Sequence, residues 1–197
     1  MTKSIKISEI QKLAIPALIS GIAEPILSIT DTIIVGNIPE NATISLGAVG
    51  IVGSFISMLI WVFGQTRSVI ASIIAQALGQ KNLKNVETLP AQGILIIISC
   101  SFLIILLTYF NSEDLFKFYN ASGDLLRFSV DYFNIRVWGL PFTLLTIGIF
   151  GIFRGLQNTF YPMIIAIVGT SLNIVLDIVF VYGVDGFISP MYIKGAA

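Results

Sequence analysis

The sequence predicts an all-α membrane protein, a polytopic transmembrane helix bundle of five complete spanning helices and the start of a sixth. Three observations lead to this fold class. Apolar residues make up 55% of the 197-residue chain and charged residues only 11%, against about 25% in soluble domains. The mean hydropathy is +0.91. Apolar stretches of about 20 residues recur, each long enough to cross a bilayer core of about 30 Å as a helix.

The five stretches are separated by short polar segments. The second continues to about residue 79, and we expect this extension to enter the cytoplasm. After the fifth, turn residues lead to a C-terminal segment that reads like the opening of a sixth helix, so we expect the chain to be truncated before that helix. The predicted spans are residues 13–35, 44–63, 91–110, 130–153 and 161–182.

Basic residues predict the orientation of the bundle. Seven of the eleven Lys and Arg residues fall on one side of the predicted spans, whereas the first loop on the other side contains Glu40 and no basic residue. Basic loops face the cytoplasm, so we expect a multi-pass protein of the cell (inner) membrane with a cytoplasmic N-terminus. The seven residues are Lys3, Lys6, Lys12, Arg67, Lys81, Lys84 and Arg154.

Composition excludes several classes of function. The chain has no histidine, which excludes His-based catalysis and His metal sites, and the single Cys100 excludes an internal disulfide and a cysteine cluster. Lys plus Arg equals Asp plus Glu, eleven each, so the charge balance indicates no nucleic-acid partner. We therefore expect neither an enzyme nor a bound organic cofactor, with a two-aspartate intramembrane protease as a formal alternative.

Four ionisable residues lie inside the predicted spans. Glu24 and Asp31 fall in the first, Arg136 in the fourth and Asp177 in the fifth. A charge at the centre of a spanning helix costs about 2.5–3.5 kcal/mol on insertion scales. Such residues therefore face the bundle interior or a water-filled cavity, where they pair, bind an ion or take up a proton.

Asp31 and Asp177 are predicted to share one site. Each lies a few residues before the outer end of a helix that runs outward, which puts both carboxylates at a similar depth. Asn173 precedes Asp177 by one turn and projects from the same face. Two carboxylates and an amide form an oxygen-rich pocket that suits Na⁺ or a proton better than a soft metal, as ion-coupled transport requires.

Simpler roles stay open for three of these side chains. Asp31 is close enough to the outer end of its helix to face water. Arg136 could extend its guanidinium to the outer surface. Glu24 could serve only a local hydrogen bond beside Pro25.

Two glycine patterns predict close packing between helices. Gly47, Gly50 and Gly53 repeat every third residue in the second span, and Gly151 and Gly155 stand four apart at the end of the fourth. Small residues let neighbouring helix backbones approach one another in a membrane.

Several segments resemble motifs of the multidrug and toxic compound extrusion (MATE) transporters, in the family's order. Residues 25–37 (PILSITDTIIVGN) resemble the family's first helix, and residues 75–79 (AQALG) the turn after the second. Residues 153–163 (FRGLQNTFYPM) are similar to the segment between helices four and five, and residues 172–183 (LNIVLDIVFVYG) to the fifth helix. The Asp-Thr-x-x-x-Gly and Asn-x-x-x-Asp patterns are closest to the damage-inducible branch.

The resemblance implies that residues 1–197 are the N-terminal lobe of a twelve-helix antiporter. Such proteins export drugs or organic cations, small molecules that are amphipathic or cationic, as Na⁺ or H⁺ enters. Family members bind the coupling cation through an acid of the first helix and an Asn and an Asp of the fifth, which map onto Asp31, Asn173 and Asp177. Glu24 and Arg136 lie outside that set and are accessory candidates.

The resemblance also implies two partners, membrane lipid and a C-terminal lobe. Alternating access needs two halves that move against each other, so we expect this chain alone not to transport. Arg67 departs from the polar stretch that the family has at the inner end of its second helix.

Two other functions remain open from the sequence. A flippase for a lipid-linked oligosaccharide has a similar helical layout and needs basic residues to meet a pyrophosphate, for which only Arg136 is a candidate. The chain could also be a non-transporting fragment of half length.

Overall fold

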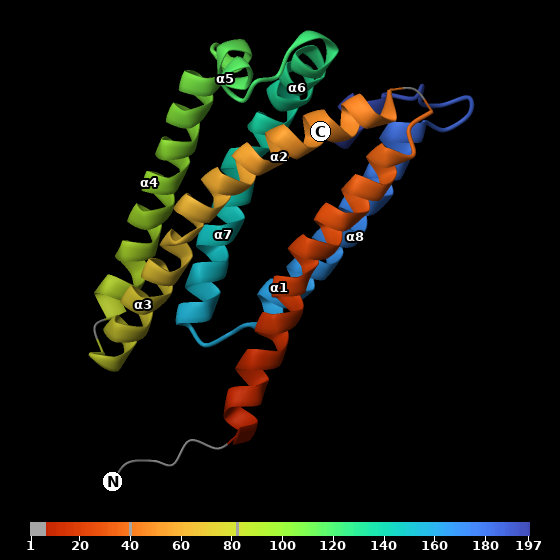
Figure 1. The fold of residues 1–197 in the computed structure, drawn as a ribbon. Helices are drawn as coiled ribbons and strands as arrows, with labels where there is room; N and C mark the ends of the chain where they lie inside the picture. Colours follow the sequence, from red (N-terminus) through yellow and green to blue (C-terminus); the bar gives the residue numbers. More distant parts are fainter. Residues whose placement is uncertain (1–6, 40, 82) are drawn as a thin grey trace.

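A computed structural model describes the backbone of residues 7–39, 41–81 and 83–197, with their side chains except at positions 9 and 83–87. Some residues that were used to predict the orientation lie outside the described part of the chain. They are Lys3, Lys6, Glu40 and the side chain of Lys84. All named elements are helical (Figure 1). They are α1 (Ile7–Gly36), α2 (Ala42–Gly64), α3 (Thr66–Gly79), α4 (Leu83–Tyr109), α5 (Ser112–Phe118), α6 (Gly123–Arg136), α7 (Leu140–Gly155) and α8 (Phe160–Tyr182), with short 3-10 helices η1 (Val137–Gly139) and η2 (Tyr192–Ala196).

The predicted fold class is confirmed. Five helical spans of the described chain are long and apolar enough to cross a membrane, and α2 with α3, and α6 with α7, each form one of them. The spans are Ile10–Gly36, Ala42–Gly79, Thr88–Tyr109, Gly123–Gly155 and Phe160–Tyr182.

Three helices begin at earlier residues than the apolar stretches from which they were predicted. α1 begins at Ile7, α4 at Leu83 and α6 at Gly123, against predicted starts at 13, 91 and 130. Hydropathy marks only the part of a helix that suits lipid, and the first turn of each of these helices contains a charged residue. The loop between the third and fourth spans also contains a short helix, α5, and the segment expected to open a sixth helix is the 3-10 helix η2.

The bundle consists of two groups of helices (Figure 1). In one, α1 lies side by side with α8, the most extensive helix pair in the structure. In the other, α3 packs against α7 and α4, while α2 packs against α6. Two hydrogen bonds join α1 to the two ends of α8. The Tyr182 hydroxyl donates to the Ile34 carbonyl at 2.8 Å, and the hydroxyl of Thr159, just before α8, donates to the Leu13 carbonyl at 2.9 Å.

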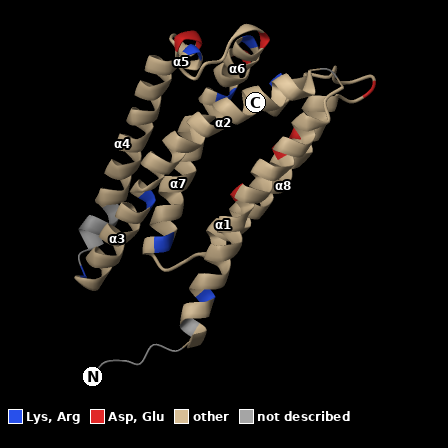
Figure 2. Ribbon diagram, viewed as in Figure 1, with Lys and Arg blue, Asp and Glu red and all other residues tan. Residues whose placement is uncertain are grey.

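Charged residues are sparse along the spans and gather towards their ends (Figure 2). At one end, α5 and α6 mix both signs, with Lys117 bonded to Glu113 at 2.7 Å and Arg127 to Asp124 at 3.3 Å. At the opposite end, blue segments mark α3 and α7 (Figure 2). Many large apolar side chains are exposed along the spans, as expected where lipid is the solvent.

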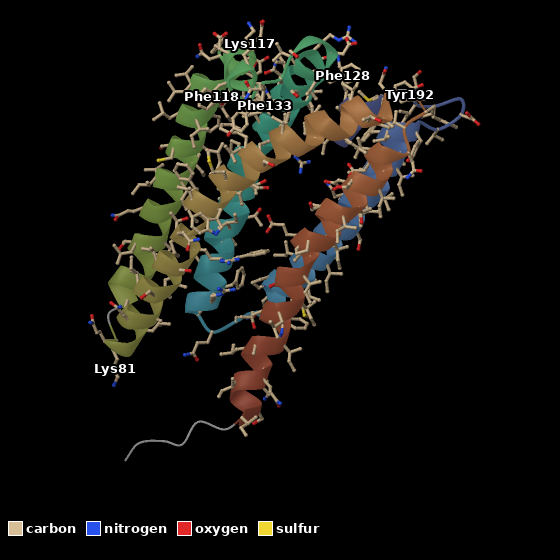
Figure 3. All side chains as sticks on the ribbon, viewed as in Figure 1. Lys81, Lys117, Phe118, Phe128, Phe133 and Tyr192 are labelled. Atoms are coloured by element: carbon tan, nitrogen blue, oxygen red, sulfur yellow. The ribbon has the colours of Figure 1, made fainter. Side chains whose placement is uncertain are left out.

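An aromatic cluster holds the end of the bundle that carries α5. Phe116 and Phe133 are fully buried, and their ring centroids lie 5.2 Å apart. Phe55 of α2 meets Phe133 edge-on at 5.9 Å. Figure 3 shows Phe133 among the helices near this end, with Lys117 and Phe118 beyond it. The cluster therefore fixes α6 against α2 and α5.

The two glycine patterns have different outcomes. At Gly151 and Gly155 close packing is confirmed, because a Cβ added there would lie 2.7 Å from the Arg67 carbonyl oxygen and 2.7 Å from the Ile74 Cβ, respectively. At Gly47 an added Cβ would lie 3.0 Å from the Leu125 Cδ1, which agrees with the prediction. At Gly50 and Gly53 the prediction is wrong, since an added Cβ would meet no atom of the described chain within 4 Å.

Candidate cation-binding site

Asp31 and Asp177 lie together where α1 packs against α8. Asp31 is 8% exposed and Asp177 6% exposed, and the two carboxyl groups lie within hydrogen-bonding reach of each other. The interpretation of Asp31 as a water-facing terminal residue therefore does not hold. The hydrogen bond from Tyr182 to Ile34 fixes the register of the two helices three residues beyond Asp31.

Three buried oxygens have no hydrogen-bond donor among the described residues. They are Oδ1 of Asp31, Oδ1 of Asn173 and Oδ1 of Asn134. Leaving a buried acceptor unsatisfied costs about 1–3 kcal/mol. Asn173 lies one turn from Asp177 on α8, so its oxygen faces the same side of that helix as the carboxylate. A proton bound between the two acids would satisfy the Asp31 oxygen, and a cation bound there would also have the Asn173 oxygen as an available ligand.

Two residues of α6 complete the electrostatic surroundings. Tyr132 is 3% exposed, and the charges of Asp31, Asp177 and Arg136 all act on its phenol. Arg136, one turn further along α6, acts on Asp177 with a charge of opposite sign. It is half-buried, so its role includes this interaction and is not limited to reaching the outer surface.

The three ionisable side chains of the site leave a small net charge. With both acids ionised, Asp31, Asp177 and Arg136 sum to a single negative charge, equal in size to the charge of one monovalent cation. Within the part of the chain that the structure describes, no three His, Cys, Asp or Glu side chains come together. Ca²⁺ needs about six to eight oxygen ligands, and the residues gathered here do not offer that set.

Glu24 is not brought to the site. It lies two turns before Asp31 on α1, about 10 Å along the helix axis, where it is exposed and forms no ion pair with any described residue. The two accessory candidates therefore have different outcomes: the charge of Arg136 acts on Asp177, and that of Glu24 does not.

Tyr132 was missed by sequence reasoning. Its position four residues before Arg136, on the same face of one helix, is a signal that could have found it. Its helix, α6, packs against η2, which also packs against α8. Lys194 of η2 bonds Asp131 of α6 at 3.1 Å.

Comparison with known proteins identifies a family and a shared fold. The sequence profile of the MatE family matches residues 16–179. The DNA damage-inducible protein F of Escherichia coli (strain K12) is 29% identical over 185 residues, which cover 94% of this chain and 39% of that protein. A probable multidrug resistance protein NorM of Idiomarina loihiensis is 26% identical over 91% of this chain and 38% of its own length.

A crystal structure of MATE in the bent conformation superposes with a TM-score of 0.85 at 23% identity, over 96% of this chain and 40% of that one. At this identity the superposition shows the shared fold. The chain thus spans about two fifths of the length of the curated relatives it matches. The profile match extends over most of the chain and includes Asp31, Asn173 and Asp177, and the chain belongs to the MatE family, the multidrug and toxic compound extrusion transporters.

Proposed function

We propose that the complete protein carrying this chain is a secondary antiporter that exports drugs or organic cations as Na⁺ or H⁺ enters. In this proposal Asp31, Asn173 and Asp177 bind the coupling cation. The observation that carries it is the pairing of two buried carboxyl groups from different helices beside unsatisfied oxygens of Asp31 and Asn173. Neighbouring buried carboxylates repel unless a cation or a proton lies between them.

Coupling follows from this repulsion. A bound cation removes the charge between α1 and α8 and stabilises their contact at Asp31 and Asp177. When the cation leaves, the two carboxylates favour a wider separation or a new positive partner. A cationic drug is such a partner, so loading with the ion and loading with the drug exclude each other. This exclusion is the requirement for exchange transport.

The proposal is tested with the complete protein in proteoliposomes under an imposed Na⁺ or pH gradient. We expect a cationic dye to move against its own gradient only while one of the two ion gradients is present. Dye movement that ignores both gradients would overturn the antiport proposal. Translocation of a lipid-linked oligosaccharide without dye transport would identify a flippase instead.

We also propose that the protein lies in the cell (inner) membrane with its N-terminus in the cytoplasm. Figure 3 places Lys81 and Lys117 at opposite ends of the bundle, and both side chains are exposed. In a Cys100→Ser background, Lys117→Cys should react with a membrane-impermeant maleimide added to intact cells. Lys81→Cys should react only after the membrane is opened. The reverse pattern would contradict the orientation.

Arg136→Gln is expected to tighten cation binding by about threefold to tenfold, because it removes a positive charge that competes with the bound cation for Asp177. Calorimetric titration of the purified complete protein with Na⁺, or with acid for a proton site, measures the change. Arg127→Gln is the matched control, because Arg127 lies on the same helix with an exposed ion pair to Asp124. Weaker cation binding in Arg136→Gln would contradict this role of the guanidinium.

A further inference from the structure

Two arginines meet at the other end of the bundle from α5. Arg67 lies in the first turn of α3 and Arg154 in the last turn of α7. Gly151 lets α7 approach so closely that a Cβ there would lie 2.7 Å from the Arg67 carbonyl oxygen. As a result, the charge of Arg67 acts directly on Arg154. The close helix contact therefore holds two like charges beside each other.

A small pocket opens at these two arginines. Arg67 and Arg154 form part of its wall together with Ser20 of α1 and Thr159, the residue before α8. The Thr159 hydroxyl donates to the Leu13 carbonyl, which fixes the start of α8 against α1. The enclosed space has room for about one water-sized group. Three distant parts of the sequence, α1, α3 and the connection from α7 to α8, thus converge on this pocket, whose wall also includes Ala17, Phe150 and Pro162.

The pocket has positive charge without a matching acid. The Nε of Arg67 is buried and has no hydrogen-bond acceptor. The ion pairs formed within the described part of the chain involve Lys117, Arg127 and Lys194, and neither arginine of the pocket. Arg67 is half-buried and Arg154 is exposed. A part-buried charge without a counter-ion is costly, and a buried N–H without an acceptor adds about 1–3 kcal/mol. A bound anion removes both costs.

We propose that this pocket binds a phosphate group, presented by an anionic phospholipid or by a free phosphate. Guanidinium groups match phosphate oxygens with paired, charge-assisted hydrogen bonds, and Arg67 and Arg154 would be the donors here, since the Ser20 hydroxyl donates to the Ala17 carbonyl at 2.9 Å. One phosphate oxygen would occupy the enclosed space, with the remaining oxygens at its mouth.

The position of the pocket fits a phosphate at the membrane surface. Arg154 lies next to the end of the fourth span and its side chain is exposed, so its guanidinium can extend toward the lipid headgroups on that side, whereas Ser20 and Arg67 lie deeper in their spans. It is distinct from the cation site, because Ser20 lies eleven residues before Asp31, about 16 Å along α1. A phosphate here would join the α1–α8 pair to the α3–α7 pair, and its occupancy would stabilise the arrangement of the two groups.

The test measures binding of two probes to the complete protein in lipid nanodiscs that contain no detergent. The base lipid of the discs is zwitterionic. One probe is inorganic phosphate, added to phosphatidylcholine discs, and the other is phosphatidylglycerol, mixed into the discs. We expect one of them to raise the thermal midpoint of the protein. The double variant Arg67→Gln with Arg154→Gln should need a probe concentration about tenfold higher, or more, to give the same rise in the thermal midpoint. Lys81→Gln, which removes an exposed charge at the same end of the bundle (Figure 3), should leave it unchanged.

The two arms distinguish the source of the phosphate. A response to phosphatidylglycerol alone assigns the pocket to a lipid headgroup, and a response to inorganic phosphate assigns it to a free phosphate. The Arg154→Lys variant, which keeps the charge and should fold, is expected to respond more weakly than the wild type because it loses the paired hydrogen bonds. No response to either probe, or an equal response in the double variant and the wild type, would overturn the proposal.

Discussion

Asp177→Asn is expected to abolish ion-driven export by the complete protein while leaving its helical structure intact. Asn has nearly the same shape as Asp, so the packing of α8 against α1 remains. The substitution removes one of the two buried negative charges that would hold the cation. Loss of one charged ligand should weaken cation binding by about 10- to 100-fold. Efflux of a cationic dye from proteoliposomes, driven by a Na⁺ or pH gradient, measures the loss.

Asp31→Asn should produce a loss of the same size, because the two carboxyl groups act as one unit. The double variant should be no worse than either single variant, since groups that act together are non-additive. Asp185→Asn is the matched control: it removes an exposed carboxylate in the turn after α8 and should transport normally. Coupled efflux at the wild-type rate in both single variants would overturn the assignment of the cation site.

The pairing of these acids was predictable because lipid makes buried charge expensive. An Asp inside a spanning helix has few tolerable neighbours, and a helix that crosses a bilayer has a nearly fixed length and depth. Depth therefore predicted that Asp31 and Asp177 lie at a similar level, and the packing of α1 against α8 brings them together. A soluble bundle lacks this constraint, and two isolated acids in it would indicate little about each other.

Tyr132 could not be found by the same reasoning from charge and depth. It carries no formal charge at neutral pH, so it does not stand out inside a spanning helix as an acid does. Its helix, α6, packs against η2, which in turn packs against α8. A Cβ added to Gly195 of η2 would lie 2.5 Å from the Phe180 carbonyl carbon. Contacts of this kind depend on tertiary packing and leave no periodic pattern in the sequence.

The arginine pair shows the same limit at the other end of the bundle. Hydropathy placed Arg67 and Arg154 on one side of the membrane. There each counted only as a separate basic residue that predicts the cytoplasmic side. Their proximity follows from the packing of α3 on α7, which the glycines of α7 permit. The glycine pattern predicted a close helix contact without naming the partner helix.

Gly155→Ala is expected to destabilise the protein by about 1–3 kcal/mol, because the added methyl group overpacks the contact between α7 and α3. Its Cβ would lie 2.7 Å from the Ile74 Cβ and 2.9 Å from the Ala71 carbonyl oxygen. Thermal unfolding of the purified protein, followed by circular dichroism, measures the change. Gly169→Ala is the matched control, because an added Cβ there meets nothing within 4 Å and Ala favours a helix over Gly.

A second substitution separates the two clashes. Ile74→Ala in the Gly155→Ala background shortens a side chain but leaves its Cβ and the Ala71 carbonyl in place, so it should not restore stability. Full rescue by Ile74→Ala would show that side-chain volume, and not backbone approach, sets the helix spacing.

Because Arg154 immediately precedes Gly155, any separation of α7 from α3 also moves the Arg154 guanidinium away from Arg67. Gly155→Ala should therefore weaken the phosphate response while leaving cation binding at Asp31 and Asp177 unchanged, since those residues lie on α1 and α8.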